Sequence, residues 1–185
     1  LYERKWTRKK LNKNKINLKD LKKIRFDDAF FKIMSSPNQS NKKWITEQYD
    51  QMVMGDTIER SGTNAAIIKI HNKDKAIAMT VDSSANYCKS YPLSGGKQIV
   101  CESWRNLISV GSKPIAITNC LNFGNPENPE IMGEFAENIL GIKEACEFLD
   151  YPVVSGNVSF YNGTNNNNIY PTPVIGGVGL IKDLK

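Results

Sequence analysis

Two short segments of the sequence are dense in Asn, Ser and Gly, and each lies at the end of an apolar run. They are Thr118–Pro126, with the sequence TNCLNFGNP, and Ser155–Asn162, with the sequence SGNVSFYN. Asparagine amide oxygens are hard, neutral ligands of the kind that Mg²⁺ accepts, and glycine lets a backbone approach a phosphate closely. The same residue types also form ordinary turns, so composition alone leaves a ligand site and a plain turn as alternatives.

Other residue types that carry chemistry are few and poorly spaced for catalysis or for zinc binding. Cys88, Cys101, Cys120 and Cys146 form no C-x-x-C pair, and His71 is the single histidine. A Cys/His zinc site and a Ser-His-Asp or Cys-His arrangement are therefore poorly supported. Because no export signal opens the sequence, we expect four reduced thiols. We expect His71 to lie in a surface turn between two strands.

Familiar nucleotide-binding motifs are absent from the sequence. Gly95-Gly96-Lys97 lacks the first Gly and the Ser/Thr of a P-loop, but it lies at a predicted helix start, where it either receives a phosphate or forms a tight turn. The glycines of 176–179 lie inside a strand pattern, which favours close backbone packing. Asp82 follows another strand and is either a metal ligand or a turn former.

Hydrophobic periodicity predicts the elements that position these residues. Two apolar runs joined by a polar turn indicate a hairpin, Ser94 is a candidate N-cap with Gly111 ending its helix, and Asn128-Pro129-Glu130 is a strong helix start. Gly156 is expected to interrupt its strand. The predicted strands are 65–70, 76–81, 115–118, 153–159 and 174–181, and the predicted helices follow Ser94 and Asn128. This order predicts a layered α+β or α/β domain.

Positive charge is concentrated in the first quarter of the 185 residues. Residues 1–43 contain 14 Lys/Arg and 4 Asp/Glu, a net charge of +10, whereas residues 44–185 contain 11 and 15, a net charge of −4. Such an arm either binds an acidic partner or is a solvated linker, and the lack of a nucleic-acid module favours the linker. One amphipathic helix is predicted between Lys19 and Met34. Because the chain begins with Leu1 rather than Met, we expect a fragment.

The two amide-rich segments, together with Tyr170–Val174, resemble the phosphoribosylformylglycinamidine synthase family, the large synthetase subunit of purine biosynthesis. The resemblance runs in order from about Trp44 to Lys185, and it includes Glu47–Asp50 and Gly95–Leu107. It is to the start of the second of two homologous halves. The resemblance implies an α+β fold, the aminoimidazole ribonucleotide synthetase N-terminal-like domain. This fold is a mixed β-sheet with helices on one face, and it pairs with a homologous domain.

This resemblance implies that the chain has two parts. Residues 1–43 are expected to be a basic linker and helix from the tail of the preceding half. Residues 44–185 are expected to be a fragment of the second synthetase N-terminal-like domain. Its partners would be the homologous first half of the same polypeptide, a glutaminase subunit or domain and a small accessory subunit, with no nucleic acid and no membrane.

The implied activity is that of an ATP-dependent C–N ligase with glutamine as the amido-nitrogen donor. It converts formylglycinamide ribonucleotide, glutamine-derived ammonia and ATP into formylglycinamidine ribonucleotide, ADP and phosphate, with Mg²⁺, in cytoplasmic de novo purine biosynthesis. ATP phosphorylates the amide oxygen, and ammonia then displaces phosphate. The alternative is a non-catalytic second-half module that binds a structural nucleotide or braces the first half.

The resemblance assigns four site residues and no catalytic one. Asn119 and Gly156 match ATP contacts, Asn157 matches a magnesium ligand, and Ser159 matches a substrate contact. Position 119 is usually Asp in the family, so Asn119 keeps an acceptor but lacks the charge. The segment after Val81 also departs from the family's Asp-Gly-Asn-Gly-Arg-Tyr, keeping only the first acid and the Tyr. The catalytic histidine belongs to the first half, so we expect this fragment alone to be inactive.

Overall fold

The computed structural model describes residues 3–8, 10, 19, 23–49, 51–60, 62–165 and 167–184. The chain divides into two compact units. The smaller unit is Asn12–Gln51, and the larger unit joins Leu1–Leu11 to Met52–Lys185.

The smaller unit contains short helices, namely α2 (Phe26–Met34), η1 (Pro37–Gln39) and α3 (Lys43–Thr46). The prediction of one continuous helix from Lys19 to Met34 is wrong, because residues 23–25 are not helical and α2 begins at Phe26. Leu21, which lies within this predicted helix, is outside the described residues. Acidic residues in the first turn of α2 complement the positive end of its dipole.

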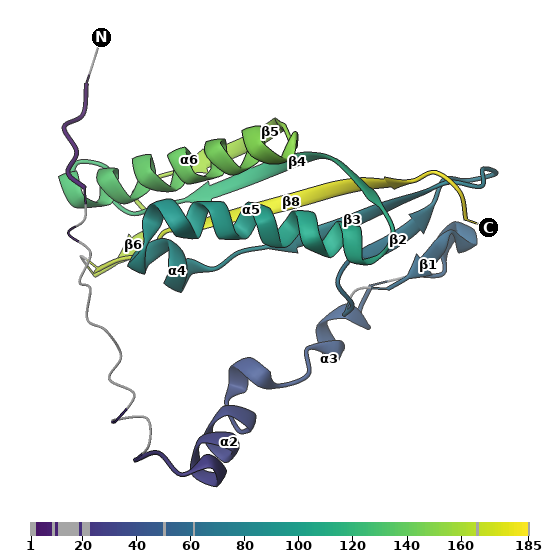
Figure 1. The fold of residues 1–185 in the computed structure, drawn as a ribbon, viewed down its shortest axis with the longest axis horizontal. Coiled ribbons are helices and arrows are strands. Elements are labelled where there is room, and N and C mark those ends of the chain that lie inside the picture. Colours follow the sequence, from purple (N-terminus) through teal and green to yellow (C-terminus); the bar gives the residue numbers. More distant parts are fainter. Residues whose placement is uncertain are drawn as a thin grey trace. The chain divides into compact units, whose positions relative to one another are not determined.

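The larger unit is built on a six-stranded mixed sheet with the strand order β1-β2-β3-β8-β4-β5 (Figure 1). Strands β4 and β5 are parallel, and the other neighbours are antiparallel. The strands are β1 (Thr57–Glu59), β2 (Ala66–Lys69), β3 (Ala76–Asp82), β4 (Lys113–Asn122), β5 (Val153–Ser159) and β8 (Thr172–Ile181). The smaller elements are η2 (Val53–Gly55) and a separate hairpin of β6 (Gly163–Thr164) with β7 (Asn167–Asn168).

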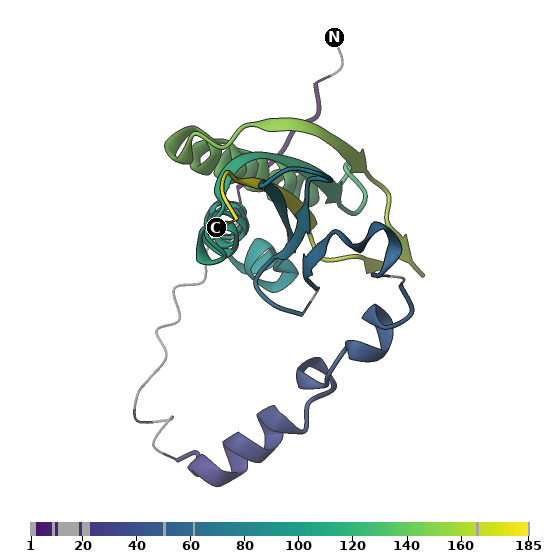
Figure 2. The same cartoon turned by 90° about the vertical axis from the view of Figure 1, so that its right-hand side faces the viewer.

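Three helices lie on one face of this sheet (Figure 2). They are α4 (Ala85–Ser90), α5 (Pro92–Ser109) and α6 (Pro129–Leu149). Along β3, buried and exposed residues alternate strictly, because successive side chains of a strand point to opposite faces. We call the side that faces the helices the helix face and the other side the open face. The core fills the space under the helices, with the fully buried Ile99, Leu107 and Ile117 among its members.

Several predicted elements are confirmed. The hairpin is β2–β3, and His71 lies exposed in the turn between its strands, with its Nδ1 3.0 Å from Asp56 Oδ2. The cap of α6 is also confirmed, because Asn128 Oδ1 accepts a hydrogen bond from the backbone N–H of Glu130 at 2.9 Å. Gly111 follows the end of α5 with φ of +77°, a conformation that favours glycine.

The predicted start of α5 is wrong. Pro92 occupies the first turn, so Ser94 lies inside the helix and is not its cap. Gly95 and Gly96 are buried in α5, which excludes both the phosphate cradle and the tight turn considered for them. A Cβ at Gly95 would lie 2.6 Å from the Cα of Cys88, so this glycine lets α4 and α5 approach closely.

The amide-rich segments are strands for much of their length. β4 continues past Thr118 to Asn122, and β5 passes through Gly156 without interruption. Backbone pairing in the parallel ladder holds both segments extended, which periodicity could not predict for polar residues. The close packing predicted for residues 176–179 is confirmed, because a Cβ at Gly177 would collide with Ser103 Oγ and Tyr151 Oη.

Candidate functional site

All four site residues expected from the sequence lie on the parallel strand pair β4–β5. In the register of this pair, Asn119 is opposite Gly156, and Cys120 is opposite Asn157. Asn122 and Ser159 are opposite each other where both strands end. The two segments lie far apart in sequence, and the ladder places the expected ATP, metal and substrate residues on two neighbouring strands.

The pleat divides these residues between the two faces of the sheet. Asn119 alternates with the buried Ile117 and Leu121, which places it on the helix face. Asn157 and Ser159 are in register with Cys120 and Asn122, which places them on the open face. The sequence did not indicate this division.

A bulge in β5 sets the division. The register shifts between Ile117 and Thr118, so that Ile117 pairs with Val153 while Thr118 pairs with Ser155. Val154 is the extra residue of this bulge. Because a shift of one residue turns every later side chain to the other face, an unbulged strand would point Asn157 toward the helices.

Gly156 and Asn119 are in close contact. A Cβ at position 156 would lie 2.8 Å from the carbonyl oxygen of Asn119 and 2.9 Å from its Cγ, and it would collide with its Oδ1. Only glycine therefore fits here without movement of Asn119. The side-chain amide of Asn119 extends over the Gly156 backbone.

Asn157 and Ser159 have different surroundings. Asn157 is exposed, and within the described part of the chain its side chain makes no hydrogen bond. Ser159 is half-buried, and its Oγ lies 3.2 Å from Nδ2 of Asn162. Sequence reasoning missed Asn162, although it is the last residue of the second amide-rich segment.

The side chain of Asn157 is chemically suited to bind Mg²⁺. Its amide oxygen is a hard, neutral ligand, and Mg²⁺ in proteins usually keeps several waters and takes few side-chain ligands. Among the described residues, no group of three or more His, Cys, Asp and Glu side chains could hold a metal ion.

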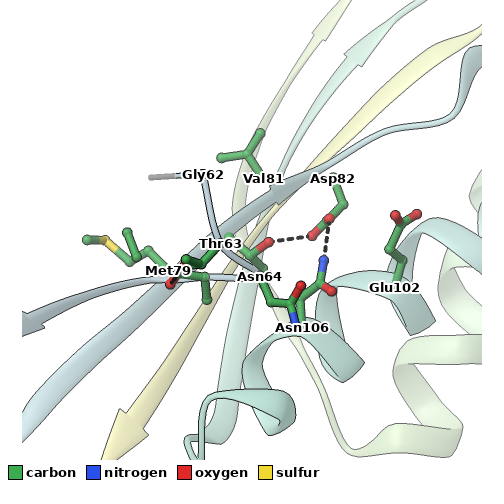
Figure 3. A pocket seen from close by; sticks show the side chains of 11 residues that line it. Gly62, Thr63, Asn64, Met79, Val81, Asp82, Glu102 and Asn106 are labelled. Carbon is green, nitrogen blue, oxygen red and sulfur yellow. Dashed lines mark hydrogen bonds between the residues drawn. The ribbon is translucent and has the colours of Figure 1, made fainter. Parts of the chain in front are cut away.

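A separate pocket of about 530 Å³ lies beside Asp82 (Figure 3). Asp82 is 8% exposed, and its carboxylate accepts hydrogen bonds from Thr80 Oγ1 and Asn106 Nδ2, each at 2.8 Å. Burial raises the pKa of Asp82, and the two hydrogen bonds oppose this rise. Asp82 is the last residue of β3 and anchors it to α5. Sequence reasoning missed Asn106, whose partner lies 24 residues away.

The four cysteines are free thiols, as expected. Burial raises the pKa of Cys88 to about 12 and that of Cys146 to about 11. Both therefore stay protonated at neutral pH and are poor nucleophiles. Among the described residues, no helix is long and apolar enough to cross a bilayer.

A mixed sheet with helices on one face, and with amide-bearing residues on its parallel strand pair, defines an α+β domain of the aminoimidazole ribonucleotide synthetase type. The fold class expected from the sequence is therefore confirmed. The chain belongs to the family described as AIR synthase related protein, N-terminal domain, whose model matches residues 62–181.

Curated and solved relatives agree with this assignment. The chain is 59% identical over 184 residues to phosphoribosylformylglycinamidine synthase subunit PurL of Pelagibacter ubique. This alignment covers 99% of this chain and 25% of the relative. The structure of PurLQS from Thermotoga maritima matches with a TM-score of 0.71 and 36% identity, over 77% of this chain and 24% of that one.

Two ligand complexes are also similar. T. maritima PurL complexed with ATP has a TM-score of 0.67 and 37% identity, covering 77% of this chain and 23% of that one. T. maritima PurL complexed with FGAR has a TM-score of 0.66 and 37% identity, with the same coverage. The resemblance found in the sequence is thus confirmed, and the chain spans about a quarter of the length of these relatives.

Proposed function

We propose that this chain is part of an ATP-dependent ligase that converts formylglycinamide ribonucleotide, glutamine-derived ammonia and ATP into formylglycinamidine ribonucleotide, ADP and phosphate. The observation that carries the proposal is the register of β4 and β5. It places Asn119 beside Gly156, and it puts Asn157 and Ser159 on one face of the same strand pair. The 59% identity to a PurL subunit supports the same activity.

The chain would contribute the second of two homologous halves. We assign residues 44–185 to the second synthetase N-terminal-like domain and residues 1–43 to the tail of the preceding half. The match to about a quarter of each relative's length supports a part of a larger polypeptide. The exposed apolar residues of the open face, such as Val81 and Val154, support pairing with a homologous domain.

ATP binding is assigned to Asn119 and Gly156. The missing Cβ at Gly156 leaves room for the side chain of Asn119, whose amide offers both a donor and an acceptor for a phosphate group. The similar structure of T. maritima PurL complexed with ATP supports this assignment. An Asn in place of the family's usual Asp removes one negative charge near the polyphosphate.

Asn157 would hold Mg²⁺, and Ser159 would bind the ribonucleotide substrate. When bound, Mg²⁺ neutralises charge on the polyphosphate. The Asn157 amide oxygen is exposed for ligation, and the Ser159 hydroxyl can donate a hydrogen bond from the end of β5. The similar structure of T. maritima PurL complexed with FGAR supports a substrate site in this fold.

The partners proposed for the whole protein are the first half of the same polypeptide, a glutaminase and a small accessory subunit. A similar chain comes from the PurLQS structure of T. maritima, which supports assembly with further subunits. We propose a cytoplasmic location. Without its first half, the chain is expected to show no synthetase activity.

The test uses Asn157→Ala in the full-length synthetase, with Ser155→Ala as a matched control on the same strand and face. Losing one well-placed transition-state contact typically lowers kcat by about 10²–10³. We expect this loss, with a higher Mg²⁺ requirement, for Asn157→Ala alone. Turnover and Mg²⁺ dependence equal to those of Ser155→Ala would instead support the non-catalytic second-half module.

A further inference from the structure

We infer that Asn162 is a positioning residue that holds the Ser159 hydroxyl in place for the ribonucleotide substrate. This inference rests on the proposed function, because it takes Ser159 as the substrate contact. It concerns a residue beyond the strand pair, in the loop that follows β5.

The side chain of Asn162 joins the ends of β4 and β5. Its Nδ2 lies 3.0 Å from the carbonyl oxygen of Phe123 and 3.0 Å from that of Ser159. The same nitrogen lies 3.2 Å from Ser159 Oγ. Because an amide nitrogen has two hydrogens, these three acceptors share two donors, and Ser159 is held through both its backbone and its hydroxyl.

The backbone around Asn162 is fixed by bonds between the two strand ends. The N–H of Asn162 donates to Phe123 O at 3.2 Å, and the N–H of Phe123 donates to Ser159 O at 3.0 Å. Between Ser159 and Asn162, Tyr161 has φ of +60°, a left-handed conformation that is unfavourable for an aromatic residue. Its N–H donates to Gly124 O at 3.0 Å, which stabilises that conformation.

The reversed backbone at Tyr161 is what turns Asn162 back toward Ser159. Strained conformations of this kind persist only when their surroundings hold them, and they are concentrated at functional sites. Tyr161 is held further by its hydroxyl, which donates to Glu127 Oε1 at 3.2 Å.

The consequence for Ser159 is a restricted hydroxyl. When Asn162 Nδ2 donates to Ser159 Oγ, the serine keeps its own proton for an acceptor on the substrate. Asn162 Oδ1, 3.3 Å from the same Oγ, is the alternative acceptor when no substrate is present. Without Asn162, the hydroxyl rotates freely and must be ordered when the substrate binds, which weakens binding.

The test compares Asn162→Ala, Ser159→Ala and the double variant in the full-length synthetase. Asn125→Ala is the matched control, since Asn125 is a neighbouring loop asparagine whose Oδ1 accepts from the Glu127 N–H and does not contact Ser159. For Asn162→Ala we expect about a tenfold rise in the KM for formylglycinamide ribonucleotide, the size of one lost hydrogen bond, with the KM for ATP unchanged. Asn125→Ala should leave both values unchanged.

The double variant decides whether Asn162 acts through Ser159. We expect Asn162→Ala to add less than about twofold when Ser159 is already Ala, as for coupled residues. An equal rise in both backgrounds, or a parallel loss of Tm, kcat and ATP affinity, would overturn the inference. If Asn162→Ala does not fold, Asn162→Asp replaces it, because it keeps the shape and the acceptor but loses the donor.

The single variants separate the inference from the proposed function. A Ser159→Ala enzyme with an unchanged KM for the ribonucleotide would refute the substrate role of Ser159, and with it the inference. A raised KM in Ser159→Ala together with an unchanged KM in Asn162→Ala would refute the inference alone.

Discussion

Replacing Gly156 with Ala is the sharpest test of the contact between β4 and β5. The added Cβ would lie 2.8 Å from the carbonyl oxygen of Asn119, which belongs to the strand backbone and cannot rotate away. It would also collide with Oδ1 of the Asn119 side chain. Both the ladder and the proposed ATP contact must therefore shift.

The size of the effect follows from the cost of overpacking. Forcing one extra carbon into a packed site costs typically about 1–3 kcal/mol. In a cooperative unit of about 150–250 residues each kcal/mol lowers Tm by roughly 2–4 °C, so we expect a decrease of about 2–12 °C for a unit of that size and a smaller one for the full-length enzyme. The displaced Asn119 amide should raise the KM for ATP by about tenfold, equivalent to about 1.4 kcal/mol.

Thermal unfolding and steady-state kinetics of the full-length enzyme measure both effects. Gly176→Ala is the control in β8, the other neighbour of β4, because its nearest neighbour is the side-chain Cγ2 of Thr118 at 2.9 Å, and the next contact is at 3.8 Å. The double variant Asn119→Ala/Gly156→Ala should recover part of the Tm loss but not the ATP affinity. Equal Tm and equal KM for ATP in Gly156→Ala and Gly176→Ala would refute the packing argument.

Three further predictions concern stability and reactivity. Gly177→Ala should lower Tm more than Gly176→Ala, because its Cβ meets the buried hydroxyl of Tyr151 rather than a movable methyl group; equal Tm values in thermal melts would contradict this. Because burial raises the pKa of Asp82 from its ordinary 3.8, its contribution to stability is present below that pH and is lost as the pH rises through the raised value. As the pH rises from about 4 to about 7, the unfolding free energy measured with urea should therefore decrease less for Asp82→Asn than for the unaltered protein. The same dependence of unfolding free energy on pH in both proteins would contradict this. In the folded chain without its proposed partner domain, iodoacetamide should modify the exposed Cys120, and Cys88 only after unfolding, as peptide mass mapping would show; alkylation of Cys88 at the rate of Cys120 would disprove it.

Local sequence predicted those elements whose signals lie within a few residues. The hairpin β2–β3 and the start of α6 at Pro129 were found because alternation and an Asn-Pro cap act locally. The start of α5 was misplaced because Ser94 and Pro92 are both reasonable local signals. Packing of Gly95 and Gly96 against neighbouring backbones favours the earlier start.

For the candidate site, sequence alone identified the residues of the two amide-rich segments and their family. Their arrangement depends on contacts between distant residues, which no local pattern encodes. The bulge at Val154 decides that Gly156 meets Asn119 while Asn157 points to the open face.

The sequence by itself determined a layered α+β or α/β domain, most of its apolar strands and helices, and the residues available for chemistry, because these depend on composition and short-range periodicity; the resemblance to a known family then favoured α+β. Only the tertiary structure decided which face each residue occupies and which hydrogen bonds hold it. The partners of Asn162 and Asp82 show this, since Asn162 reaches Phe123 across 39 residues and Asp82 reaches Asn106 across 24. The physical reason is that strand register and helix packing are set by burial of the whole core, not by neighbours in the chain.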